Sequence, residues 1–114
     1  MSEYHSPGKT TLSPDVLLTI ARQAALEVEG VSSMAPVKGR ANSLFGHADG
    51  GVRMTVEEGN VFVDLYLVVE KDVNIREISR TIQHKVARSI AEITGLEIGH
   101  INIHIEDIDF QTEA

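Results

Sequence analysis

The stretch that decides the fold is VFVDLYLVV at residues 61–69, and a second apolar pattern of different period follows it at residues 75–93. In the first stretch apolar side chains fall on every second residue, which predicts a β-strand whose successive side chains point to opposite faces. In the second they recur every three or four residues, which predicts an amphipathic helix. The strand face is formed by Val61, Val63, Leu65, Leu67 and Val69, and the helix stripe by Ile75, Ile78, Ile82, Val86, Ile90 and Ile93.

Capping residues place the ends of this helix and of an earlier one. Asn74 with Glu77 three positions later resembles a capping box, and Gly95 is a typical helix stop. Near the N-terminus, Ser13 followed by proline predicts a helix start, and Gly30 predicts its end. Apolar and alanine residues recur at helical spacing between them.

Two further strands flank the central pattern. Alternating residues over 52–57 and the turn sequence at 58–60 predict a hairpin with the strand at 61–69. After the second helix, apolar residues alternate over 96–105, but their phase slips by one residue across Gly99 and His100. Such a slip is typical of a β-bulge.

These elements predict a single α+β domain of order α-β-β-α-β at residues 12–108. Each helix has one apolar stripe, so both are expected on one face of a three-stranded sheet, with the other face open to solvent. The expected core comprises Ile20, Ala24, Val63, Leu65, Leu67, Ile78, Ile82, Val86, Ile101 and Ile103. Residues 1–11 are expected to be a disordered lead, residues 35–51 a flexible loop, and residues 109–114 an acidic tail.

Composition narrows the classes of function. The chain has 114 residues, 42% of them apolar, with no cysteine and a formal charge of −7. The lack of cysteine fits a reducing, cytoplasmic setting, and the longest apolar run, residues 65–69, is too short to insert into a membrane. The negative charge disfavours nucleic acid and anionic lipid as partners.

The sequence carries no recognisable catalytic motif. It contains neither a nucleophile elbow nor a phosphate-binding glycine loop, so we expect no enzyme activity and no cofactor. The sharpest metal candidate is the pair His100 and His104. On a strand these residues lie about 13 Å apart, which is too far for one ion, so we expect no metal site.

The open face of the sheet is the first candidate interaction surface. Phe62 and Tyr66 alternate with the core residues of their strand, and Arg53 and His104 are expected beside them. Aromatic residues on a mixed polar surface are typical of protein interfaces. The alternative is that these side chains pack beneath the long loop or the tail.

The second candidate is a basic stripe on the second helix. Arg76, Arg80, His84 and Arg88 are spaced by four and lie on one flank. This stripe could contact phosphates, which makes a nucleic-acid-binding module the alternative function. The other interpretation is a solvated helix face.

Six short segments stand out together by their order and spacing: LSPDV at 12–16, EVEGV at 27–31, DLYLVVE at 64–70, VNI at 73–75, TGLEI at 94–98 and INIHIE at 101–106. In this order and spacing they resemble the alkaline shock protein family of bacterial envelope stress response proteins. The resemblance runs from about residue 11 to residue 108, but the loop at 35–51 departs from it and long charged tails are absent.

The resemblance implies an abundant cytoplasmic factor that lies beneath the cell membrane, recruited by a membrane-embedded partner, and is linked to envelope homeostasis. The family has no established catalytic motif, so no active-site residue is carried over. Together with the open face, the resemblance predicts a non-catalytic interaction or scaffold protein of the cell-envelope stress response. We expect other proteins as partners, with self-association through the open face or the sheet edges.

Overall fold

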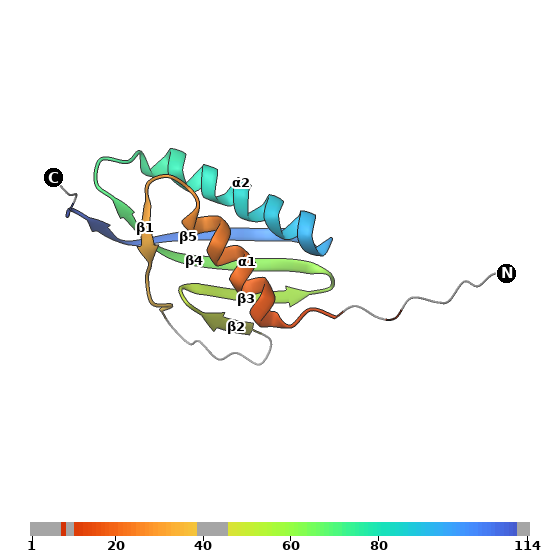
Figure 1. Cartoon of the computed structure of the whole chain (residues 1–114). Helices are drawn as coiled ribbons and strands as arrows, with labels where there is room; N and C mark the ends of the chain where they lie inside the picture. The colour runs from red at the N-terminus through yellow and green to blue at the C-terminus, as the bar shows by residue number, and fades with distance from the viewer. Residues whose placement is uncertain (1–7, 9–10, 39–45, 112–114) are drawn as a thin grey trace.

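Seven elements follow one another in the order α-β-β-β-β-α-β in the computed structural model, which describes residues 8, 11–38 and 46–111 (Figure 1). The elements are α1 (Pro14–Leu26), β1 (Val31–Met34), β2 (Gly46–Asp49), β3 (Val52–Glu57), β4 (Asn60–Glu70), α2 (Ile75–Thr94) and β5 (Glu97–Asp109). No helix among these residues is both long and apolar enough to cross a bilayer.

Strand β4 is the centre of a five-stranded mixed sheet. Its first half pairs antiparallel with β3, its last residues pair antiparallel with β1, and β5 runs parallel to it along its whole length. The backbone of Tyr66 marks the junction, because its N–H donates to Gly51 and its carbonyl accepts from Ala35. Strands β3 and β1 therefore follow one another along one edge of β4, while β5 takes the other edge and β2 pairs with the outer side of β3.

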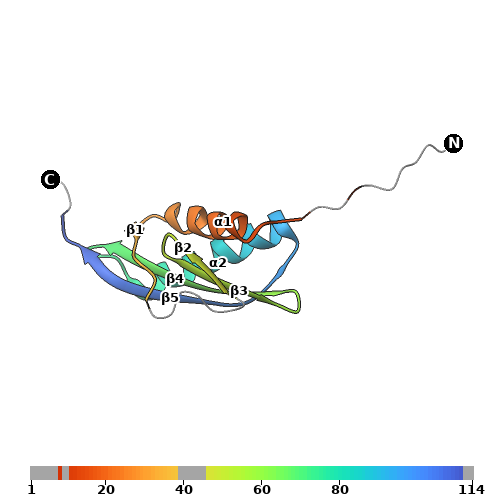
Figure 2. The same ribbon diagram turned by 90° about the horizontal axis from the view of Figure 1, so that it is seen from below.

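Both helices cover the same face of this sheet (Figure 2). Their apolar stripes meet the strand face predicted from residues 61–69, which is fully buried at Leu65 and Leu67. Seven of the ten predicted core residues are buried, whereas Ile20, Ile101 and Ile103 are half-buried against the core. The two β5 isoleucines stay partly open because β5 is an edge strand covered only by α2.

The predicted number of strands is wrong, since the sheet has five strands and not three. Strands β1 and β2 were missed, and both lie where the sequence predicted a connection: β1 at residues 31–34 and β2 inside the loop expected at 35–51. Residues 46–51 therefore form a strand and a turn within the segment predicted as a loop. Residues 39–45, most of the expected lead and the last residues of the expected tail lie outside the described residues.

The predicted helix ends and the predicted bulge agree better with the structure than the predicted number of strands. The Asn74 side chain accepts from the backbone N–H of Glu77 at 3.0 Å, and Gly95 ends α2 in the left-handed conformation. Ser13 occupies the N-cap of α1 but makes no side-chain capping bond. The predicted bulge is confirmed, because the β4–β5 register shifts at Gly99, and a second shift follows at Glu106.

Candidate functional site

The sheet face opposite the helices carries an ordered grid of polar and aromatic side chains. Strand pairing places Arg53 beside Asp64 and Asp64 beside Asn102. One step along, Tyr66 pairs with His104, and in the other direction Phe62 pairs with His100. The four predicted interaction residues, Phe62, Tyr66, Arg53 and His104, thus lie on one face, as the alternation of the strands predicted.

Tyr66 is held in a stack and is not an exposed anchor. Its ring lies parallel to the His104 ring, with 4.4 Å between the ring centroids and 10° between the planes. The guanidinium carbon of Arg53 lies 5.8 Å from the Tyr66 ring centroid, within reach of a cation–π contact. Tyr66 is only 6% exposed, so most of its ring area is already used inside this chain.

The chain that follows β1 covers this end of the face. Ala35 donates its N–H to the Tyr66 carbonyl at 2.8 Å, and the Lys38 carbonyl accepts from the Arg53 guanidinium. The Lys38 ammonium reaches Glu106 on β5 at 3.0 Å. Because Lys38 contacts both β3 and β5, residues 35–38 cross the sheet beside Tyr66, as one of the two sequence interpretations predicted.

The Phe62 end of the face is different. No contact between the described residues places another segment over Phe62, which is half-buried by its own sheet neighbours. Its ring lies 5.7 Å from the ring of His100, which is exposed, and the neighbouring Asn102 is exposed as well. We call this end, formed by Thr55, Phe62, His100 and Asn102, the open patch.

Asp64 links the two ends of the face. One of its carboxylate oxygens accepts from the Asn102 amide at 3.1 Å and contacts Nε2 of His104 at 3.0 Å. In a catalytic triad the imidazole would use its other nitrogen to activate a hydroxyl or thiol. Among the described residues no hydroxyl is hydrogen-bonded to His104, whose contacts are with Asp64 and Tyr66.

The two histidines of the 100–104 segment both point to this face, but they do not converge. His100 contacts Phe62, whereas His104 contacts Asp64 and Tyr66. Within the described residues no group of three or more potential ligands is arranged to hold a metal ion. Sequence reasoning did not place His100 on the face, because the Gly99 bulge resets the alternation just before it.

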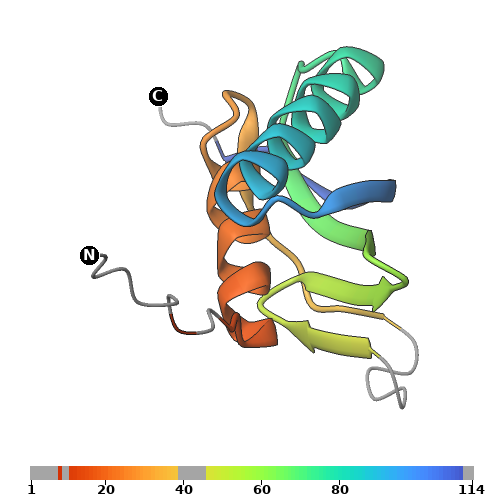
Figure 3. The ribbon, with the colours of Figure 1, turned by 90° about the vertical axis from the view of Figure 1, so that its right-hand side faces the viewer.

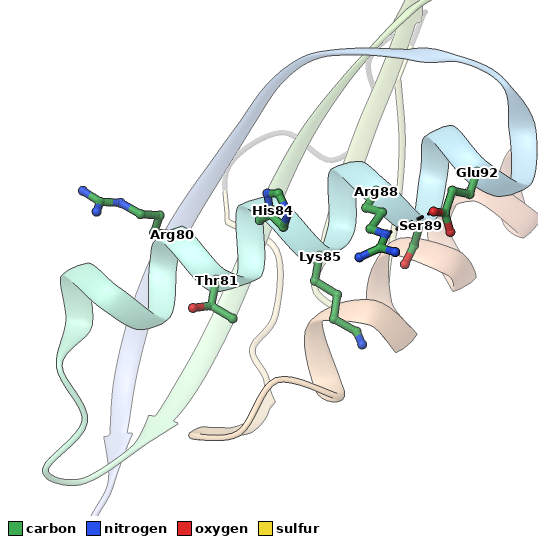
Figure 4. A pocket seen from close by; sticks show the side chains of 7 residues that line it. All are labelled: Arg80, Thr81, His84, Lys85, Arg88, Ser89 and Glu92. Carbon is green, nitrogen blue, oxygen red and sulfur yellow. Dashed lines mark hydrogen bonds and ion pairs between the residues drawn. The ribbon is translucent and has the colours of Figure 1, made fainter.

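The basic stripe lies on the helix side of the molecule, and one of its four members, Arg88, is paired with a carboxylate. Figure 4 shows the side chains of Arg80, His84 and Lys85 pointing in different directions from α2. Lys85 pairs with Glu27 of α1 at 3.0 Å, and Arg88 pairs with Glu92 at 3.0 Å. Arg76, Arg80, His84 and Arg88 are all exposed, which is the arrangement of a solvated helix face.

Solved structures of other small α+β domains share this fold. It superposes on the copper form of the MamM CTD with a TM-score of 0.54 and 12% identity, covering 89% of this chain and 92% of that one. The zinc form of the MamM CTD D249N variant gives a TM-score of 0.53 and 11% identity, covering 86% of this chain and 89% of that one. At this identity the likeness concerns the fold alone.

Sequence similarity identifies the protein family more closely than the fold does. Residues 2–110 match the model of the alkaline shock protein 23 family, described as having a cell envelope-related function. The uncharacterized protein YqhY of Bacillus subtilis is 32% identical over 94% of this chain and 82% of its own length. The uncharacterized protein Spy1614 of Streptococcus pyogenes is 32% identical over 89% of this chain and 88% of its own length. The chain belongs to the alkaline shock protein 23 family, as the sequence resemblance implied.

Proposed function

We propose that this chain is a non-catalytic protein-binding module with a role in the cell-envelope stress response, and that it binds through the open patch. The observation that carries the proposal is the division of the sheet face. One end is packed by Arg53, Tyr66, His104 and residues 35–38. At the other end Phe62 is half-buried and His100 is exposed. A rigid support beside an accessible aromatic group is the arrangement that a contact surface needs.

The chemistry of the face supports binding over catalysis. Asp64 is occupied by two donors, and His104 is held by Asp64 and by the Tyr66 ring. These contacts fix side-chain positions and lower the entropy lost on association. The partner in this proposal is another protein, either a second copy or a membrane-embedded recruiter that holds the chain at the cytoplasmic side of the membrane.

The test is a comparison of Phe62→Ser with Phe110→Ser. Phe110 is 70% exposed and lies just beyond β5, so it is a matched aromatic control far from the open patch. Affinity capture from soluble and detergent-solubilised membrane fractions of the native host, followed by sedimentation, measures partner recovery and assembly. We expect Phe62→Ser to reduce one of these at least about tenfold, as for an interface anchor, and Phe110→Ser to leave both unchanged. Equal recovery and assembly for Phe62→Ser and wild type would refute the proposal.

A further inference from the structure

The open patch is bordered by two glutamates, at the end of the sheet where β3 turns into β4 and β5 begins (Figure 3). Strand pairing places Glu57 of β3 opposite Asn60 of β4, and Asn60 opposite Glu97 of β5. Directly paired residues share a face, and Asn60 lies two positions before Phe62 on β4, so this row of three belongs to the open face. We call Glu57 and Glu97 the carboxylate pair.

The carboxylate pair lies close enough to Phe62 for one ligand group to contact all three. Neighbouring strands are about 4.8 Å apart, so about 10 Å separates the Cα atoms of Glu57 and Glu97. Two residues along a strand span about 7 Å, which is the distance from this row to the row of Thr55, Phe62 and His100. A long side chain that enters between the two carboxylates therefore reaches the Phe62 ring.

Both carboxylates are exposed, and neither takes part in an ion pair between described residues. The described cations that contact this face, Arg53 and Lys38, lie at its other end. The Arg53 guanidinium donates to the Lys38 carbonyl and lies beside the Tyr66 ring, and the Lys38 ammonium pairs with Glu106. The face is therefore divided by charge, with its engaged cations at the covered end and the carboxylate pair beside the open patch.

Phe62 adds an apolar surface beside the carboxylate pair. A Cβ on Gly99 would lie 2.8 Å from two ring carbons of Phe62, so the ring rests against the bare backbone of β5. The ring is half-buried there, and its centroid lies 5.7 Å from that of the His100 ring. An aromatic ring next to carboxylates complements the side chain of Lys or Arg, because the methylene stem packs on the ring and the charged head reaches the carboxylates.

We infer that the open patch binds a segment of another protein that bears Lys or Arg, with one cationic side chain held between the carboxylate pair and its stem on Phe62. This inference rests on the proposed function and names the chemistry of the partner. Cytoplasmic loops of membrane proteins carry an excess of Lys and Arg near their membrane-spanning helices, so a membrane-embedded recruiter presents such a segment. A second copy is the weaker occupant, because two chains of formal charge −7 repel each other, and the same repulsion disfavours an anionic lipid surface.

The probe is a short peptide that alternates arginine and serine. Its control is the same peptide with every arginine replaced by citrulline, which keeps the shape of the side chain and removes its charge. Each is titrated into isotope-labelled full-length protein at about 0.15 M salt, and amide chemical shifts report binding by NMR. We expect saturable shifts centred on the open patch and the carboxylate pair, and at least about tenfold weaker binding of the citrulline peptide.

Protein variants locate the site. The double variant Glu57→Gln, Glu97→Gln keeps the side-chain shape, and it should weaken binding of the arginine peptide at least about tenfold. The matched control is Glu29→Gln, Glu70→Gln, because both glutamates are exposed and lie at the opposite end of β4, where the Glu70 N–H donates to the Gly30 carbonyl. This control removes the same total charge and should bind within about twofold of wild type.

The same variants separate this inference from the proposed function when partners are captured from membrane fractions. Loss of the partner in Phe62→Ser with full recovery in Glu57→Gln, Glu97→Gln would retain a protein-binding patch and reject a cationic partner. Full recovery in Phe62→Ser would reject both. Loss in both variants, with full recovery in Glu29→Gln, Glu70→Gln, is the expected result.

In the peptide titration the inference is overturned by any of four results: no saturable binding, shifts centred away from the open patch, equal binding of the citrulline peptide, or an equal loss in the Glu29→Gln, Glu70→Gln control. A change in sedimentation caused by Glu57→Gln, Glu97→Gln alone would reassign the patch to self-association. Binding to phosphatidylglycerol vesicles that this variant alters would reassign it to lipid. Each reassignment also rejects a cationic protein segment as the partner.

Discussion

Replacement of Leu65 by alanine tests the strand assignment on which the whole architecture depends. Leu65 is 0% exposed, lies in the middle of β4, and has Val52 of β3 and Ile103 of β5 as its cross-strand neighbours. Buried Leu→Ala replacements cost about 2–5 kcal/mol, and the cost rises with the volume of the cavity that remains. Because β4 is hydrogen-bonded on both edges, its backbone cannot move to fill the space, so we expect about 3–4 kcal/mol.

A loss of about 3 kcal/mol changes the folding equilibrium constant by a factor of roughly 100–200. With a urea m-value of about 2 kcal/mol/M, the unfolding midpoint should fall by about 1.5–2 M. The matched control is Leu26→Ala at the end of α1, where the leucine is 39% exposed, and there the expected loss is well under about 1 kcal/mol. Equilibrium urea unfolding monitored by circular dichroism measures both. A cost below about 1 kcal/mol for Leu65→Ala, or equal costs for the two variants, would show that the wrong face of β4 was assigned to the core.

Three further predictions concern local geometry. A Cβ on Gly99 would lie 2.8 Å from two ring carbons of Phe62. The Gly99→Ala replacement should therefore lower the free energy of unfolding by about 1–3 kcal/mol, and by much less in a Phe62→Ala background. A double-mutant cycle measured by urea unfolding tests this. Asn74→Ala should destabilise the chain by about 1 kcal/mol, whereas Ser13→Ala, which loses no capping bond, should cost a few tenths in the same assay; equal losses would contradict the capping assignment. The pKa of Asp109 is lowered chiefly by a hydrogen bond from the Ser32 hydroxyl and next by one from the Gln111 N–H, and these two effects outweigh the opposite effect of desolvation. The ionised Asp109 carboxylate therefore stabilises the fold above the pKa of the unfolded state, and this stabilisation is lost as the pH falls through the folded-state pKa. Ser32→Ala should raise the pKa of Asp109 in an NMR titration, and an unchanged pKa would show that the serine bond is not formed in solution.

The sequence predicted the long elements well because their signals are local. The period of residues 61–69, the Asn74 cap and the Gly95 stop depend on side chains close in the chain, and the structure confirms all three. The phase slip at Gly99 was readable for the same reason, since a bulge changes which residues of one strand share a face. The sequence predicted the position of the Ser13 N-cap correctly, but the Ser13 hydroxyl makes no capping hydrogen bond.

The missed strands lack such local signals. Strand β1 is VSSM and β2 is GHAD, and neither shows the alternation of apolar and polar residues that identifies a strand. Their pairing depends on edges offered by β4 and β3, which is tertiary context that outweighs propensity. The sequence left two interpretations open for Tyr66, an exposed anchor or a ring beneath the loop, because its cover comes from residues 35–38, whose path is fixed by bonds to distant Arg53 and Glu106.

The parallel pairing of β4 with β5 has a consequence for how the protein is made. Strand β4 leaves the ribosome well before its partner, because α2 must be synthesised between them. Until β5 follows, one whole edge of the most apolar strand has no hydrogen-bonding partner, and α2 has only part of a sheet to cover. Unpaired apolar strand edges of this kind attract other nascent chains. Chains whose translation stops within α2 should therefore depend on chaperones, and the time between the synthesis of β4 and that of β5 is the interval in which this protein is most exposed to misassembly.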